Sequence, residues 1–233
     1  MKEFKITGFS DFCEELLKAG FSMGGGNDEG IYAVVPFSWN NKPDNTNIQW
    51  HTGERETDPW EWRIRVLDER EDIAYAKLFM NKSGYITKEW YPCFLAVRRK
   101  GKSFADAYAD GEVSHFGKRI YDLISQHGVL PLDVIKKLGG FSKEDKSAFD
   151  RAVTELQMKM FITICGRQQK TAKTGEEYGW ASTAFCRVED FFEKSVFDKA
   201  AKLSQDEAAL KIKEQILKLS PDAQEKKIKK FIG

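Results

Sequence analysis

The chain has 233 residues, of which 41% are hydrophobic and 13% aromatic, so it can bury the core of one large domain or two ordinary ones. Its formal net charge of +1 lacks the strong basic excess that most duplex-binding proteins carry. No apolar run approaches the roughly 20 residues that span a bilayer, and the N-terminal "MKEFKITGFSDF" lacks an apolar signal region. We therefore expect a cytoplasmic protein that neither spans nor binds a membrane.

The four cysteines and three histidines form no metal-ligand motif. No two cysteines stand in a Cys-x-x-Cys pair, and the histidines are isolated. We expect reduced, structural cysteines, no metal and no cofactor. Cys165 and Cys186 flank a predicted hairpin, so we expect them to lie near each other across it.

Residues 1–112 predict a mixed α/β region. A helix over "SDFCEELLKAG" begins with Ser10 as its cap and stops at Gly20. The run Gly24–Gly26 precedes "IYAVV" rather than a helix, which favours a turn over a phosphate loop. The polar segment that follows, "SWNNKPDNTNIQWHTGERET", predicts a loop or an exposed hairpin.

A second helix begins where Asp58 can cap it and Pro59 suits its first position, with Glu61 completing a capping box. Trp60, Ile64 and Leu67 would share its apolar face, and the helical pattern continues through "DIAYAKLFM". The segment "GYIT" then predicts a strand, and "KEWYPCFLAVRR" and "SFADAYADG" predict short helices.

Residues 113–192 predict a winged helix-turn-helix, so the fold class is α+β. Three helical segments, "SHFGKRIYDLISQHG", "LPLDVIKKLGG" and "SKEDKSAFDRAVTELQMKM", precede two apolar runs, "FITICG" and "YGWASTAFC". Three helices closed by a β-hairpin wing commonly bind duplex DNA, although the same scaffold also binds proteins.

Residues 193–233 predict a C-terminal helical extension. Ser204 with Glu207 forms a capping box, and Ser220 followed by Pro221 predicts another helix start. The apolar stripe of these helices favours a homodimer or the docking of a partner, and the terminal lysines favour a solvated face over a nucleic-acid or membrane patch. The apolar positions are Leu210, Ile212, Ile216, Leu217 and Leu219.

The third helix of the predicted winged helix, capped by Ser142, is its candidate recognition helix. One face is apolar and should be buried: Phe149, Ala152, Val153, Leu156 and Met160. On the opposite face Arg151 can contact a guanine edge or a phosphate, with Ser147 and Thr154 as hydrogen-bonding neighbours. Lys143 and Lys146 would contact the DNA backbone.

Acidic side chains weigh against this interpretation. Glu144, Asp150 and Glu155 lie on or beside the same face, where they would repel phosphates unless each binds a cytosine amino group or pairs with Arg151. The predicted wing is only mildly basic. Its candidate DNA-binding residues are Arg167, Gln168, Gln169, Lys170 and Lys173, and the glutamines could enter a minor groove.

The segments "KRIYDLISQHG", "FDRAVTELQMKMFITICG" and "YGW" resemble the AlkZ-related proteins, small bacterial relatives of the AlkZ-type DNA glycosylases. The resemblance covers residues 57–192, and "FDRAVTELQ" is its most specific part. It implies winged-helix elements that hold lesion-bearing DNA. Those glycosylases carry a glutamine–apolar–glutamine or glutamine–apolar–aspartate tripeptide near the N-terminus, and this chain has none; its nearest fragment is Gln49-Trp50-His51.

Three functions remain open. The leading prediction is a non-catalytic duplex DNA-binding protein of regulation or repair. A divergent glycosylase acting on alkylated or crosslinked DNA is the second, and a protein-interaction module is the third. An aromatic group within residues 1–112 belongs mainly to the core, with a stacking pocket for a flipped base or a flat ligand as the alternative. Its members are Trp39, Trp50, Trp60, Trp62, Trp90 and Tyr91.

Overall fold

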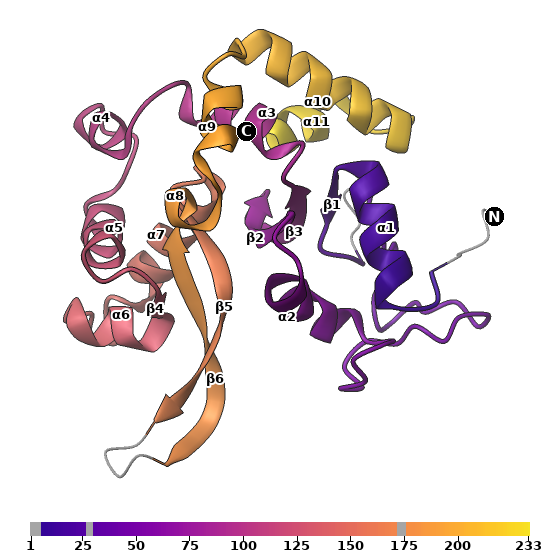
Figure 1. The fold of residues 1–233 in the computed structure, drawn as a ribbon, viewed down its shortest axis with the longest axis horizontal. Helices are drawn as coiled ribbons and strands as arrows, with labels where there is room; N and C mark the ends of the chain where they lie inside the picture. The colour runs from indigo at the N-terminus through magenta and orange to yellow at the C-terminus, as the bar shows by residue number, and fades with distance from the viewer. Residues whose placement is uncertain (1–5, 27–29, 172–175) are drawn as a thin grey trace.

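The computed structural model describes residues 6–26, 30–171 and 176–233 and shows a mixed α+β protein with two three-stranded antiparallel sheets (Figure 1). The elements fall into three segments of the chain, residues 6–109, 115–187 and 188–233. The first segment contains α1 (Phe9–Ala19), β1 (Phe21–Met23), α2 (Pro59–Glu69), β2 (Ile73–Phe79), β3 (Lys82–Thr87), α3 (Tyr91–Arg99) and α4 (Phe104–Ala109). The second contains α5 (His115–His127), β4 (Leu130–Pro131), α6 (Leu132–Leu138), α7 (Lys146–Met158), β5 (Ile162–Thr171) and β6 (Glu177–Arg187). The last contains α8 (Val188–Phe191), α9 (Lys194–Ala200), α10 (Gln205–Leu219) and α11 (Glu225–Ile232).

The first sheet has the strand order β1-β3-β2, and it corrects one prediction. Residues 72–80 do not continue helix α2, because β2 pairs antiparallel with β3 in this segment. A two-residue turn joins the strands, and its residues, Met80 and Asn81, have φ of 51° and 63°. Positive φ at both central positions is typical of the tight turns that match the twist of a hairpin.

Helix α2 begins as expected and buries Ile64 as predicted, but the predicted core residue Trp60 does not belong to its buried face. The Asp58 side chain accepts a hydrogen bond from the Trp60 backbone N–H at 2.8 Å, and Pro59 occupies the first turn. Trp62 and Val66 are fully buried, whereas Trp60 is 40% exposed. The other helix of this segment, α1, ends at Gly20 as expected, but its N-cap is Gly8 rather than Ser10.

The second segment places three helices against the sheet β4-β6-β5. The Ser114 hydroxyl caps α5 by accepting a hydrogen bond from the Gly117 N–H at 3.1 Å. Helix α7 begins at Lys146, one turn later than predicted, because Ser142 N–H bonds to Asp145 Oδ2 at 2.8 Å in a local turn instead of capping the helix. The long β5–β6 hairpin projects away from the helices in Figure 1.

The C-terminal helices pack on α3 of the same chain. The capping box of Ser204 and Glu207 begins α10 as predicted. Helix α11 begins at Glu225, not at Ser220, which instead ends α10. Ile212 and Ile216 are buried in this packing, so only part of the apolar stripe stays exposed for the predicted homodimer. That exposed part consists of Leu210 and Leu217.

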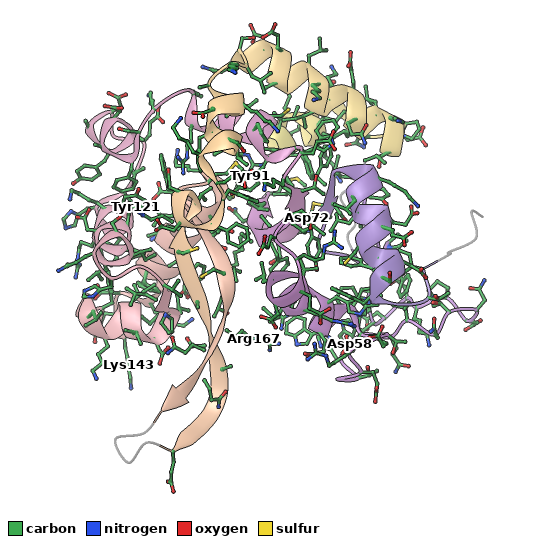
Figure 2. The ribbon with its side chains drawn as sticks, viewed as in Figure 1. Asp58, Asp72, Tyr91, Tyr121, Lys143 and Arg167 are labelled. Atoms are coloured by element: carbon green, nitrogen blue, oxygen red, sulfur yellow. The ribbon has the colours of Figure 1, made fainter. Side chains whose placement is uncertain are left out.

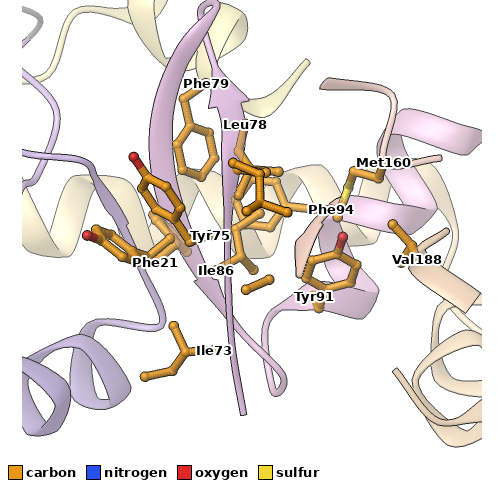
Figure 3. Close-up of a cluster of buried hydrophobic side chains, with 14 of the residues drawn as sticks. Phe21, Ile73, Tyr75, Leu78, Phe79, Ile86, Tyr91, Phe94, Met160 and Val188 are labelled. Carbon is orange, nitrogen blue, oxygen red and sulfur yellow. The ribbon is translucent and has the colours of Figure 1, made fainter. Parts of the chain in front are cut away.

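One cluster of buried hydrophobic residues includes side chains from all these segments (Figure 3). At its centre, the rings of Phe79 from β2 and Phe231 from α11 stack with centroids 3.8 Å apart. Their contact attaches the C-terminal helix to the first sheet. Within the described residues, no helix is both long and apolar enough to cross a membrane.

Candidate nucleic-acid interface

Helix α7 is amphipathic and presents a polar face to solvent. Phe149, Ala152, Val153 and Leu156 are buried on its inner face, as predicted, and Met160 is buried just beyond its end. Lys146, Ser147 and Arg151 are exposed on its outer face. The helix therefore has the polarity that the sequence predicts.

A groove of about 790 Å³ lies along this outer face. The residues that line it are Lys77, Asn81, Lys143, Glu144, Lys146, Ser147, Asp150, Arg151, Thr154 and Glu155. Five of the ten predicted DNA-binding residues are thus brought together: Lys143, Lys146, Ser147, Arg151 and Thr154. The other wall comes from the β2–β3 hairpin, which contributes Lys77 and Asn81. Sequence reasoning missed these two residues because it assigned β2 to a helix.

The acidic residues of the groove are engaged by neighbouring groups of the protein. Asp150 lies 3.6 Å from Lys146 Nζ and 3.9 Å from Lys136 Nζ. Glu155 Oε2 accepts hydrogen bonds from the Ser114 hydroxyl at 2.7 Å and the Ser114 N–H at 3.2 Å. These carboxylates stabilise the protein's own helices and ion pairs, so their negative charge toward the groove is partly offset.

Glu144 stays ionised at the mouth of the groove. A hydrogen bond from Ser142 lowers the pKa of the Glu144 carboxyl below its ordinary value. Four cationic side chains line the same groove, namely Lys77, Lys143, Lys146 and Arg151, against three carboxylates. The lining of the groove therefore has a net charge of +1, and its cations are concentrated in one small part of the surface.

Two side chains of α7 are held by the protein itself. The Thr154 hydroxyl donates to the Asp150 carbonyl at 2.9 Å and accepts from Lys77 Nζ at 3.5 Å. Arg151 Nε donates to the Ser147 carbonyl at 3.3 Å, and the side chain is exposed. Arg151 is consequently the α7 side chain best placed to bind an acceptor outside the protein.

The groove continues toward the first sheet. Lys77, Asp150 and Thr154 also line a neighbouring pocket of about 370 Å³, whose floor includes the buried Gln157. Arg63 and Tyr75 connect that pocket to a third one, of about 330 Å³, beside Gly24–Gly26. The exposed Trp60 lines this end, and the Arg63 guanidinium stacks on its ring at 3.2 Å from the centroid.

Of the predicted wing residues, Arg167, Gln168 and Gln169 are described, and none of these three lines the groove. Arg167 is on β5 and pairs with Glu61 of α2 at 3.4 Å (Figure 2). Gln168 is exposed, and Gln169 Nε2 donates to the Gly179 carbonyl within the hairpin at 2.8 Å. The Lys170 side chain and the whole of Lys173 lie outside the described residues.

The buried carboxylate nearest to the aromatic end, Asp58, has a structural role. Its two oxygens accept hydrogen bonds from four backbone N–H groups, those of His51, Thr52, Gly53 and Trp60, at 2.8–3.0 Å. They hold the 50–53 loop against the start of α2. Among the described residues, no group of three or more His, Cys, Asp or Glu side chains could hold a metal ion.

The whole described chain corresponds to one protein family. It matches the family described as "AlkZ related" over residues 6–233, well beyond the segment 57–192 in which the resemblance was visible by motif. The chain therefore belongs to the AlkZ-related family. No curated protein and no solved structure matches it.

Proposed function

We propose that this protein binds duplex DNA through a winged-helix unit formed by α5, α6, α7 and the β5–β6 hairpin. The chain order of three helices and a terminal hairpin, with strands arranged β4-β6-β5, supports this assignment. In such units the third helix enters the major groove, and α7 occupies that position. Family membership supports a link to DNA repair.

The observation that carries the proposal is the groove along α7. Its cations come from two separate elements, since Lys77 belongs to β2 whereas Lys143, Lys146 and Arg151 belong to α7 and the turn before it. Phosphate neutralisation supplies most sequence-independent affinity for DNA, and local charge matters more than net charge. The acidic side chains Asp150 and Glu155, which would otherwise repel phosphates, interact with groups of the protein itself.

Each side chain has a proposed role. Arg151 binds a guanine edge or a phosphate, and Ser147 lies one turn away as a second hydrogen-bonding group. Lys77, Lys143 and Lys146 bind the phosphate backbone, while Thr154 holds Lys77 in place. The hairpin residues Arg167, Gln168, Gln169, Lys170 and Lys173 form a second contact in the neighbouring minor groove.

The function that we propose is the sensing of DNA damage or regulation, without glycosylase activity. The glutamine tripeptide of AlkZ-type enzymes is absent from the sequence. Gln157, the buried glutamine beside the groove, is occupied on both sides, because its Oε1 accepts from the Lys77 N–H and its Nε2 donates to the Val153 carbonyl, each at 3.0 Å. Asp58 is similarly occupied by backbone groups.

Fluorescence anisotropy with a labelled duplex tests the binding. We expect Arg151→Ala to weaken affinity by about 1–3 kcal/mol, or roughly 5- to 150-fold. Lys218→Ala is the matched control, because it removes the same charge from an exposed position on α10. Equal duplex affinities of the Arg151→Ala and Lys218→Ala variants would contradict DNA binding through the groove.

Abasic-site formation on duplexes that carry alkylated or crosslinked bases tests the absence of catalysis. We expect no product above background under conditions in which binding is saturated. Product formation would instead favour the divergent glycosylase, and substitution of the carboxylates and glutamines of the first segment would then identify its catalytic groups.

A further inference from the structure

Two cysteines lie side by side where the β5–β6 hairpin leaves the protein core. Thr163 is the register partner of Cys186, and Ile164 is the partner of Phe185. Cys165 lies in the register shift between Ile164 and Gly166, so it is the extra residue of a bulge two positions from the Thr163–Cys186 pair. Cys165 lies between the buried part of β5, where Ile164 is 8% exposed, and its exposed part, where Arg167 is exposed.

The two thiols are in direct contact. The Cys186 thiol donates a hydrogen bond to the Cys165 sulfur, and both cysteines are unbridged. Cys165 is partly exposed, whereas Cys186 is 3% exposed. An accessible sulfur is thus backed by a buried one, which is the arrangement of an attacking thiol with a resolving partner.

From this geometry we propose that Cys165 and Cys186 form a reactive dithiol, a modification site that small-molecule disulfides oxidise reversibly to a Cys165–Cys186 disulfide. The proposal is independent of DNA binding. It assigns a chemical property to the hairpin base that neither the fold nor the groove requires.

The electrostatics of the pair support this division of roles. The hydrogen bond from Cys186 lowers the pKa of the Cys165 thiol, although burial opposes it. The same contact, together with burial, raises the pKa of Cys186 far above its ordinary value. A thiolate, not a thiol, is the nucleophile, so Cys165 reacts first.

The oxidation proceeds by two exchange steps. The Cys165 thiolate attacks one sulfur of the small disulfide, whose S–S bond breaks as a mixed disulfide forms and one small thiolate leaves. Formation of the mixed disulfide removes the Cys165 thiolate, which is the main cause of the raised pKa of Cys186. Cys186 then gives its proton to the departed small thiolate, and its own thiolate attacks Cys165 Sγ and releases the second small thiolate. Two electrons pass from the cysteine pair to the small disulfide, and a reducing thiol reverses both steps.

The other two cysteines provide internal controls. Cys13 is 4% exposed, and burial raises its pKa to about 11. Cys93 is 2% exposed, and burial also raises its pKa. Both should be inert under conditions that oxidise Cys165.

Alkylation of the reduced full-length protein by iodoacetamide, followed by peptide mass spectrometry, tests the reactivity. We expect Cys165 to be labelled at least about tenfold faster than Cys13, Cys93 and Cys186. Cys186→Ala should slow the labelling of Cys165, because the donor that stabilises its thiolate is lost. A labelling rate of Cys165 no higher than that of Cys93 in the wild-type protein would overturn the proposal.

Treatment with glutathione disulfide tests the resolving step. We expect a Cys165–Cys186 cross-linked peptide in the wild-type protein, a lasting glutathione adduct on Cys165 in Cys186→Ala, and neither product in Cys165→Ala. A lasting adduct in the wild-type protein, or no reaction of Cys165, contradicts the assignment. Thermal unfolding of the variants separates these outcomes from misfolding, and Cys165→Ala alone should abolish the reaction while the protein stays folded.

Discussion

The backbone N–H of Lys77 donates a hydrogen bond to Oε1 of Gln157 at 3.0 Å, across 80 positions of the chain. This hydrogen bond joins strand β2 to the buried side of helix α7. A shift of the candidate recognition helix along β2 would therefore break it. The same lysine extends its ammonium group to Thr154 on the outer face. Lys77 therefore contacts α7 on its buried side through its backbone and on its outer side through its ammonium group.

Replacement of Gln157 should destabilise the protein. Gln157→Leu keeps the volume similar but leaves the Lys77 N–H without its acceptor at a part-buried position. We expect the free energy of unfolding to fall by about 1–3 kcal/mol. Urea denaturation measures this change, with Thr154→Val as a control near the surface that should cost less than about 1 kcal/mol. A Gln157→Leu cost no larger than the control's would mean that the contact does not hold α7.

The ion pair of Arg167 and Glu61 predicts an unusual gain of affinity. Glu61→Gln removes the partner of Arg167 across the 3.4 Å pair and also removes one negative charge, so Arg167 becomes available to a phosphate. We expect duplex affinity to rise by about two- to fivefold, in keeping with the modest energy of exposed pairs.

Anisotropy titrations of a double-mutant cycle separate the two causes of that gain. In the Arg167→Ala background, Glu61→Gln should give a smaller gain, because no arginine is released. An identical gain in both backgrounds would show that the hairpin arginine does not contact the duplex.

Arg98 should be the most sensitive cation for folding. Its half-buried guanidinium donates to the carbonyls of Phe231 and Ile232 at the end of α11, and to that of Met158 at the end of α7, at 2.8–3.2 Å. Desolvation lowers the pKa of Arg98 to about 10, still well above neutrality. Arg98→Met should cost about 2 kcal/mol or more in chemical denaturation, because several carbonyls lose a charged donor. Arg151→Met, at an exposed position, should change stability by less than about 0.5 kcal/mol.

The pair of Arg70 and Asp72 predicts part of the acid sensitivity. Two hydrogen bonds, at 2.6 and 2.9 Å, lower the pKa of Asp72 below its ordinary value of 3.8. The stabilisation is therefore fully present above pH 3.8 and is lost as the pH falls through the lower folded-state value. At pH 6 the unfolding free energy of Asp72→Asn should be lower than that of the wild type. The difference should be less than about 1 kcal/mol because the pair is part-exposed, and it should be smaller at pH 2. A difference that is constant with pH would exclude the ion pair as its cause.

Patterns within short segments predicted most helices correctly, whereas the β2 segment shows where they failed. "IAYAKLF" is apolar at nearly every position and combines good helix formers with β-branched and aromatic residues, so its periodicity is ambiguous. The decisive signal was Asn81 ahead of "KSGYIT", which favours a tight turn between two strands. Pairing with β3 outweighed the helical preference of the segment.

Only the part of the candidate site that lies on a single helix was predictable from the sequence. The face of α7 follows from helical spacing, and Ser147 and Arg151 needed nothing more, whereas Lys143 lies in the turn before the helix. Lys77 and the engagement of Glu155 by Ser114 depend on contacts between distant segments, which no local pattern contains. The adjacency of Cys165 and Cys186 was predictable because a hairpin brings its two flanks together.

The salt dependence of duplex affinity tests the central claim most directly. If the four groove cations, Lys77, Lys143, Lys146 and Arg151, neutralise phosphates, the logarithm of the association constant should fall with the logarithm of salt concentration with a slope of about −3 to −4. Lys143→Ala should reduce the size of that slope by about one, and Lys218→Ala should leave it unchanged. An affinity that is indifferent to salt, or a slope that Lys143→Ala does not alter, would contradict DNA binding through this groove.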